Sequence, residues 1–267
     1  MSVRHARRLL ALSAAALLIA SSAFAQAKPF EPTVGQAGKD VVWVPTPQTL
    51  VEKMLDLAKV TPQDFLMDLG SGDGRTVITA AKRGATAQGI EYNPDMVELS
   101  KKNAAAAGVT AKATFVKADL FETDFSKAQV VTMFQLPSIN MRLRPQILKM
   151  RPGTRIVANT FTMEDWEPDT SETIGGDCTS WCTAHLWIVP AQVQGTWQAG
   201  QNALTLTQKF QNVSGTLGST AITGGKLRGD EITFSAGGTK YTGKVNGNSI
   251  SGTMSGGSSG SWSATKK

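Results

Sequence analysis

The sequence is poor in the residues that build metal centres. Its 267 residues include two cysteines and two histidines. Only one histidine, His185, lies outside the first 25 residues, which excludes a two-histidine metal centre in the rest of the chain. His185 stands beside the apolar run Leu186–Val189. We therefore expect it to be a hydrogen-bonded strand residue rather than a catalytic group, and we predict no metal ligands.

The two cysteines are close together in the chain. Cys178 and Cys182 enclose only three residues, and a metal site would need more ligands of this kind nearby. In an oxidising compartment, such a pair can close a small disulfide loop. The sequence therefore predicts a disulfide.

The sequence also lacks an apolar run long enough to cross a bilayer stably. The apolar segment of residues 9–20 is too short, and three arginines precede it. Small residues at Ala23 and Ala25 resemble a cleavage site, so residues 1–25 are predicted to be a secretory signal peptide. We expect a mature chain from about Gln26, exported to a bacterial periplasm. An uncleaved anchor is the alternative.

No dense run of lysine and arginine remains once the signal is removed. The formal charge of +6 falls to +3, because the signal carries three arginines and no acidic residue. This charge does not imply a nucleic-acid partner.

The most informative segment runs from Phe65 to Arg75. A short apolar stretch containing Asp68 is followed by three glycines at alternate positions, Gly70, Gly72 and Gly74. Glycine lets the chain adopt positive φ and lets a ligand approach the backbone without meeting a Cβ atom. The segment therefore predicts a strand and a tight turn whose bare amide groups face a small polar ligand.

A second carboxylate follows at the expected distance. Residues 75–83 have helical apolar spacing and end before Gly84, and residues 87–91 form the next apolar stretch. Glu91 ends this stretch, 23 residues after Asp68, where the tip of the next parallel strand should lie. A carboxylate at that place can hold both hydroxyls of a ribose.

The spacing of the glycines distinguishes between cofactors. Dinucleotide sites use G-x-G-x-x-G, with a pyrophosphate at the helix start, whereas this chain has G-x-G-x-G two residues after Asp68. An acidic loop suits the ammonium group of a methionine moiety better than a pyrophosphate. S-adenosylmethionine is therefore favoured over a dinucleotide, and both over a glycine turn without a ligand.

Strands and helices alternate through residues 26–191. Such alternation predicts an α/β domain with a doubly wound, mostly parallel sheet and a ligand at the carboxyl ends of its strands. Thr46 is expected to cap the first helix, with proline at its first position. The expected helices span residues 46–60, 75–83, 93–107 and 139–150, and the expected strands span residues 65–68, 87–91, 114–119, 129–134 and 155–159.

From Gln192 onward the composition changes. Fifteen of the 26 glycines fall in the last 77 residues, and short alternating apolar runs recur between Gly/Asn turns. Residues 192–267 are therefore predicted to form a small antiparallel β meander or barrel. Pairing of Gly195–Trp197 with Gly260–Ser263 would close it and remove exposed edges. The alternative is a flexible tail.

Residues from about 40 to 190 resemble the class I, seven-stranded methyltransferases. More narrowly, they resemble the lysine methyltransferases of the mitochondrial ATP-synthase c-subunit type and their bacterial relatives. The matching stretches are Val44–Pro47, Asp68–Arg75, Glu91–Pro94, Ala118–Leu120, Phe134–Pro137 and Asp165–Asp169.

The resemblance implies S-adenosylmethionine as cofactor and assigns roles residue by residue. The glycine loop would hold the methionine part, Glu91 with its neighbour the ribose, and Asp119 with Leu120 the adenine. Residues 45–47 would fold over the cofactor, and Phe134 to Pro137 would lie against the transferred methyl group. We hypothesise that Gln135 orients the acceptor amine. The cofactor-binding residues so implied are Thr46, Asp68, Gly70, Ser71, Gly72, Gly74, Glu91, Tyr92, Asp119 and Leu120.

Two functions of different class follow from these patterns. The first is a methyltransferase acting on a protein lysine or another amine, and the second is a non-enzymatic exported envelope protein that uses the fold as a binding module. Asp119 could instead merely cap a turn, and Trp43 and Trp166 are expected to be core aromatics rather than walls of a substrate cage. Envelope contact through the C-terminal domain and the oligomeric state are left open.

Overall fold

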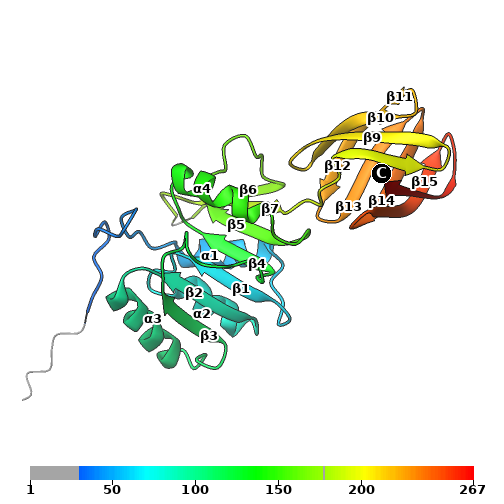
Figure 1. Ribbon diagram of the computed structural model, residues 1–267. Coiled ribbons are helices and arrows are strands. Elements are labelled where there is room, and N and C mark those ends of the chain that lie inside the picture. Colours follow the sequence, from blue (N-terminus) through cyan, green and yellow to red (C-terminus); the bar gives the residue numbers. More distant parts are fainter. Residues whose placement is uncertain (1–29, 177) are drawn as a thin grey trace, which may run out of the picture. The chain divides into compact units, whose positions relative to one another are not determined.

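The computed structural model describes residues 30–176 and 178–267. The predicted signal peptide lies outside these residues. The first part of the described chain contains a seven-stranded sheet in the order β3-β2-β1-β4-β5-β7-β6 (Figure 1). Its strands are β1 (Phe65–Leu69), β2 (Thr86–Glu91), β3 (Ala113–Lys117), β4 (Val130–Met133), β5 (Arg155–Asn159), β6 (Thr170–Thr173) and β7 (Thr183–Ile188).

All strands of this sheet are parallel except β7. Strands β1 to β5 pair in parallel, and β7 pairs antiparallel with both β5 and β6. β1 and β4 are almost continuously buried, as strands covered on both faces are. The prediction of a mostly parallel seven-stranded sheet is confirmed.

Four helices of the described residues cover the two faces of the sheet. They are α1 (Gln48–Leu57), α2 (Arg75–Lys82), α3 (Pro94–Ala106) and α4 (Pro137–Ile147). Apolar residues of α1, α2 and α3 form one core with Leu66 and Val157, and those of α4 form another with Met67 and Ile156. Because side chains alternate along a strand, these neighbours in sequence face opposite sides of the sheet.

The start of α3 and the end of α2 follow local chemistry. Asn93 caps α3 by accepting a hydrogen bond from the backbone nitrogen of Asp95, and Gly84 adopts a φ of 94° beyond the end of α2. The expected capping of α1 by Thr46 is wrong, because Pro47 is the cap residue and no side chain bonds there. The Thr46 hydroxyl instead accepts a hydrogen bond from Asn159.

Residues 195–266 form a closed antiparallel barrel, as predicted. The chain runs around it through β8 (Gly195–Ala199), β9 (Asn202–Lys209), β10 (Asn212–Leu217), β12 (Thr223–Arg228), β13 (Glu231–Ala236), β14 (Thr239–Asn246), β15 (Ser249–Gly256) and β16 (Gly260–Lys266). The pairings β9–β10 and β8–β16 close the ring, and the short β11 (Thr220–Ala221) pairs with β10. Buried apolar side chains, among them Trp197, Leu204 and Phe234, fill the interior.

The register of the closing pair differs from the expected one. Trp197 and Gln198 of β8 face Lys266 and Thr265 of β16, whereas residues 260–263 pair with β15. Closing an antiparallel barrel requires such a stagger between strands, which shifts the contact toward the end of β16.

The predicted disulfide is present between Cys178 and Cys182. Across the described residues, none of the helices is long and apolar enough to cross a membrane. The same residues contain no group of three or more His, Cys, Asp or Glu side chains arranged to hold a metal ion.

Candidate functional site

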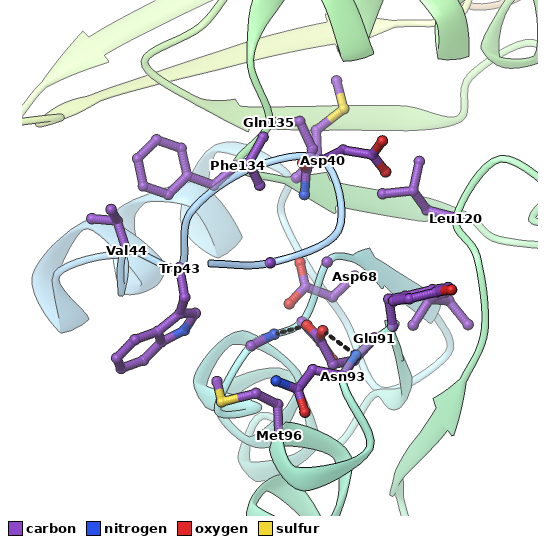
Figure 2. A pocket seen from close by; sticks show the side chains of 18 of the residues that line it. Asp40, Trp43, Val44, Asp68, Glu91, Asn93, Met96, Leu120, Phe134 and Gln135 are labelled. Carbon is purple, nitrogen blue, oxygen red and sulfur yellow. Dashed lines mark hydrogen bonds between the residues drawn. The ribbon is translucent and has the colours of Figure 1, made fainter. Parts of the chain in front are cut away.

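A cavity of about 230 Å³ lies where β1, β2 and β4 end. The carboxyl ends of parallel strands are the usual ligand site in such a sheet. The cavity walls come from the glycine loop after β1, from Glu91 to Asn93 after β2, and from Phe134 to Leu136 after β4. Figure 2 shows Asp68 and Glu91 side by side in this cavity.

The glycine loop has the conformation that its sequence predicts. Gly70, Gly72 and Gly74 have φ values of 85°, 54° and 83°. A Cβ atom on Gly70 would lie 2.2 Å from the side-chain nitrogen of Gln135, and one on Gly72 would lie 2.6 Å from the indole nitrogen of Trp43. The loop therefore needs glycine both for its dihedral angles and for its close neighbours.

Glu91 is fixed by two backbone amides. One carboxylate oxygen accepts a hydrogen bond from the nitrogen of Gly72 at 2.9 Å, and the other accepts one from the nitrogen of Asn93 at 2.9 Å (dashed lines in Figure 2). A carboxylate oxygen can accept more than one hydrogen bond, so both oxygens keep capacity for two ribose hydroxyls. The side chain is therefore held in place before any ligand arrives.

Asp68 is a buried acid at the base of the cavity. Its burial, opposed by a hydrogen bond from the hydroxyl of Thr132 and reinforced by the negative charge of Glu91, raises the pKa of Asp68 to about 7. Its side chain is therefore poised between its neutral and charged forms near neutral pH. A cation bound beside it would favour the charged form.

Residues 36–46, which we call the strap, line the cavity from the N-terminal side. Lys39 in the strap forms an ion pair with Asp119, and this hydrogen bond lowers the pKa of the Asp119 carboxyl group. At the other end of the strap, Arg75 donates to the carbonyl of Thr46 at 2.8 Å and pairs with Asp73. The strap is thus tied to the segment after β3 and to the start of α2.

Gln135 lies at the end of β4 and is buried. Its side-chain nitrogen donates to the carbonyl of Leu69 at 2.9 Å, so its amide supports the glycine loop. The neighbouring Phe134 faces the cavity, and its ring packs against Phe161 and Trp181. The role of Gln135 in orienting an amine stays a prediction.

Nearly all of the predicted cofactor residues meet at this cavity. Gly74 does not line it: a Cβ atom there would lie 2.8 Å from the ring of Phe115, so its glycine serves packing between α2 and β3. Ser71 lines the wall, but its buried hydroxyl has no hydrogen-bond partner. The predicted site residues that line the cavity are Thr46, Asp68, Gly70, Ser71, Gly72, Glu91, Tyr92, Asp119, Leu120, Phe134 and Gln135.

The lining residues that the sequence did not indicate include Lys39, Asp40, Phe161 and Trp181. Trp181 stands between the two cysteines, and only this position in the sequence could have indicated a role at the site. Trp43 lines the cavity above Gly72 and is not a core residue, whereas Trp166 is fully buried beside Trp187, as expected.

His185 has the structural role expected from the sequence. Its Nε2 donates to the carbonyl of Thr160 at 3.0 Å, and its Nδ1 accepts from the hydroxyl of Ser171 at 2.8 Å. Burial lowers the pKa of His185, which keeps the ring neutral.

The cavity suits a cationic nucleoside. Asp40, Asp68 and Glu91 bring negative charge to it, and the basic side chains among the described residues of its wall, Lys39 and Arg75, are paired with carboxylates. The loop backbone and Glu91 match a methionine part and a ribose, respectively. The residues present therefore fit S-adenosylmethionine.

Comparisons with known proteins point the same way. Residues 68–170 match the ANTKMT methyltransferase domain. The chain is 44% identical over 131 residues to a protein-lysine N-methyltransferase of Saccharolobus islandicus, a match that covers 48% of this chain and 81% of that protein. It is 34% identical over 128 residues to the human ATP-synthase c-subunit lysine N-methyltransferase, covering 48% of this chain and 54% of the human protein.

A solved structure is similar as well. An RNA methyltransferase from Salinibacter ruber in complex with S-adenosyl-L-homocysteine is 45% identical, with a TM-score of 0.53. The match covers 56% of this chain and 96% of that one. The chain thus spans nearly all of this structure but about half the length of the human relative.

The raised pKa of Asp68 predicts a pH-dependent affinity for S-adenosylmethionine. An acid with a pKa of about 7 goes from about one tenth to about nine tenths ionised between pH 6 and pH 8, so we expect the affinity to rise about tenfold over that range. Isothermal titration calorimetry at several pH values measures this. Asp68→Asn should bind weakly with little pH dependence, and an equal slope in the variant would contradict the assignment.

The packing of Gly74 predicts that Gly74→Ala will destabilise the folded protein without weakening its affinity for the cofactor. Gly74→Ala introduces strain at φ 83° and a clash with Phe115, so we expect the free energy of unfolding to fall by about 2 kcal/mol. Gly108→Ala is the matched control, because its φ is 69° and nothing lies within 4 Å of the new Cβ atom. Denaturant unfolding measures both variants. Weaker cofactor binding by Gly74→Ala at unchanged stability would mean that Gly74 touches the cofactor.

Proposed function

We propose that this chain, which belongs to the protein-lysine N-methyltransferase family, transfers a methyl group to the side-chain amine of a protein lysine. The general activity follows from the matches themselves: the chain is an S-adenosylmethionine-dependent methyltransferase. The matches do not favour the alternative of a non-enzymatic binding module.

The rim of the cavity is the observation that carries the proposal. Among the described residues, six large apolar side chains are exposed, and four of them line this cavity: Val42, Tyr92, Leu136 and Trp181. Exposed apolar side chains that gather around a site mark a place where another molecule docks. A protein substrate could cover this rim while one lysine reaches inside.

The similarity to an RNA methyltransferase makes RNA the second candidate acceptor. RNA binding draws on lysine and arginine that are free to contact phosphates. On the described cavity wall, however, Lys39 pairs with Asp119 and Arg75 pairs with Asp73. The acidic, apolar opening therefore favours a protein.

The residues of the cavity would align the acceptor and keep water out. When bound, S-adenosylmethionine supplies an electrophilic methyl group, and its transfer to a neutral amine leaves a thioether. Glu91 and the glycine loop would fix the cofactor, and Phe134 would present an apolar wall to the acceptor. The amine of lysine, whose ordinary pKa is about 10.4, has to lose its proton before it can attack the methyl group.

A methylation assay tests the acceptor class. We expect labelled methyl groups to enter the protein of a mixed bacterial extract, and the signal to disappear when lysines are blocked beforehand. Glu91→Ala should lower cofactor affinity about a hundredfold, because it removes the partner of two ribose hydroxyls. Glu122→Ala, an exposed carboxylate outside the cavity, is the matched control. Label in the RNA fraction alone would overturn the proposal.

We also propose that the protein is exported and works in an oxidising compartment. The disulfide between Cys178 and Cys182 supports this, because such bonds persist outside the reducing cytosol. When the full chain is produced in a Gram-negative bacterium, we expect a periplasmic form that begins near Gln26 and has no free thiol. Mass spectrometry after alkylation checks both. A full-length cytosolic form with two free thiols would contradict export.

A further inference from the structure

Three aromatic rings gather at one end of the cavity. Phe134 follows β4, Phe161 follows β5 and Trp181 precedes β7, so the rings come from three separate segments. The ring centroid of Phe134 lies 6.0 Å from that of Phe161 and 6.1 Å from that of Trp181. In Figure 2, Phe134 and Leu120 lie on opposite sides of the cavity, so Phe134 lies away from the predicted adenine end.

The backbone is strained at two places that position these rings. Thr160, directly before Phe161, has a φ of 58°, and Trp181 has a φ of 55°. This region is unfavourable for a β-branched or bulky residue. Thr160 is held there by its backbone nitrogen, which donates to Thr183, and by its carbonyl, which accepts from His185. Strain of this kind is typical of segments that place a functional group.

Trp181 lines the cavity and stands between the two disulfide-bonded cysteines. It is 43% exposed, so core packing does not explain its position. The bond between Cys178 and Cys182 closes a ring of the chain around Trp181 and restricts its motion. The carbonyl of Cys182 also accepts a hydrogen bond from Ile174, which ties the loop to the segment after β6.

The charge of the cavity favours a cation near these rings. Asp40, Asp68 and Glu91 line the same cavity, and the two basic residues of its described wall are paired. Aromatic faces attract ammonium groups, and the face of tryptophan attracts them most strongly. An ammonium group with an aliphatic stem would therefore find both apolar contact and favourable electrostatics here.

We propose that Phe134, Phe161 and Trp181 form an acceptor cage that binds the ammonium or methylammonium group of the substrate by cation–π contact, with Trp181 kept in place by the disulfide. The proposal rests on the proposed function in that it assumes an amine acceptor. The cage retains partly methylated lysine and accommodates the positive charge that nitrogen gains on methylation. Trp181 is thus a specificity-determining residue.

A binding experiment tests the cage without requiring turnover. The full chain, saturated with S-adenosylhomocysteine, is titrated with N-acetyl-trimethyllysine amide and with its neutral isostere, in which carbon replaces the quaternary nitrogen. We expect the charged probe to bind about tenfold more tightly, a factor typical of a cation over an aromatic face. Trp181→Ala should lose most of this preference, and Trp181→Phe should retain part of it.

The disulfide is tested with Trp181 unchanged. The double variant Cys178→Ser with Cys182→Ser should bind the charged probe more weakly than the oxidised wild type. A reductant should weaken binding by the wild type to the same extent and leave the double variant unaffected. Titration with S-adenosylhomocysteine shows for each variant that the cofactor site is folded.

Two results would overturn the cage: equal or undetectable binding of the two probes by wild type, or an unchanged preference in Trp181→Ala. Equal binding by the oxidised protein and the double variant would overturn the part assigned to the disulfide. These outcomes are independent of the methylation assay. If the protein prefers the charged probe but labels no lysine, the result would support the cage and contradict lysine as the acceptor.

Discussion

The fixed carboxylate of Glu91 is the interaction on which the site depends. Its two oxygens join the turn after β1 to the turn after β2 through the amides of Gly72 and Asn93. The geometry requires a bare backbone at Gly72 and positive φ along the loop. One side chain therefore organises two loops and sets the direction from which a ribose can enter. The strap and the rings after β4 and β5 are arranged around this centre.

The parts of the site that the sequence predicts are those determined by local chemistry. The spacing of Asp68, the alternating glycines and Glu91 indicates their roles, because the acids lie at or next to the ends of strands and the glycines permit a turn. Asn93 caps its helix for the same reason, and β5 has the predicted bounds. In such segments, backbone conformation and hydrophobic periodicity agree, and tertiary packing changes little.

The remainder depends on contacts between segments distant in the chain. Lys39 meets Asp119 across 80 residues, and nothing near either residue indicates the pair. Phe161 enters the cavity because Thr160 has an unusual positive φ, which the conformational preference of threonine does not predict. The segment of β12 gives little indication of a strand, because Gly224 and Gly225 interrupt its apolar alternation. Thr46 failed as a cap because its hydroxyl is bonded to Asn159.

The closed barrel has a consequence for how the chain acquires its structure. Its ring joins β8 to β16, the first and last of its strands in sequence, so no complete barrel can exist until β16 has been synthesised. The seven-stranded sheet is complete once β7 has been made, well before that point. During synthesis from the N-terminus, the catalytic sheet can therefore begin to fold before the barrel. The barrel is the last part to gain its long-range contacts.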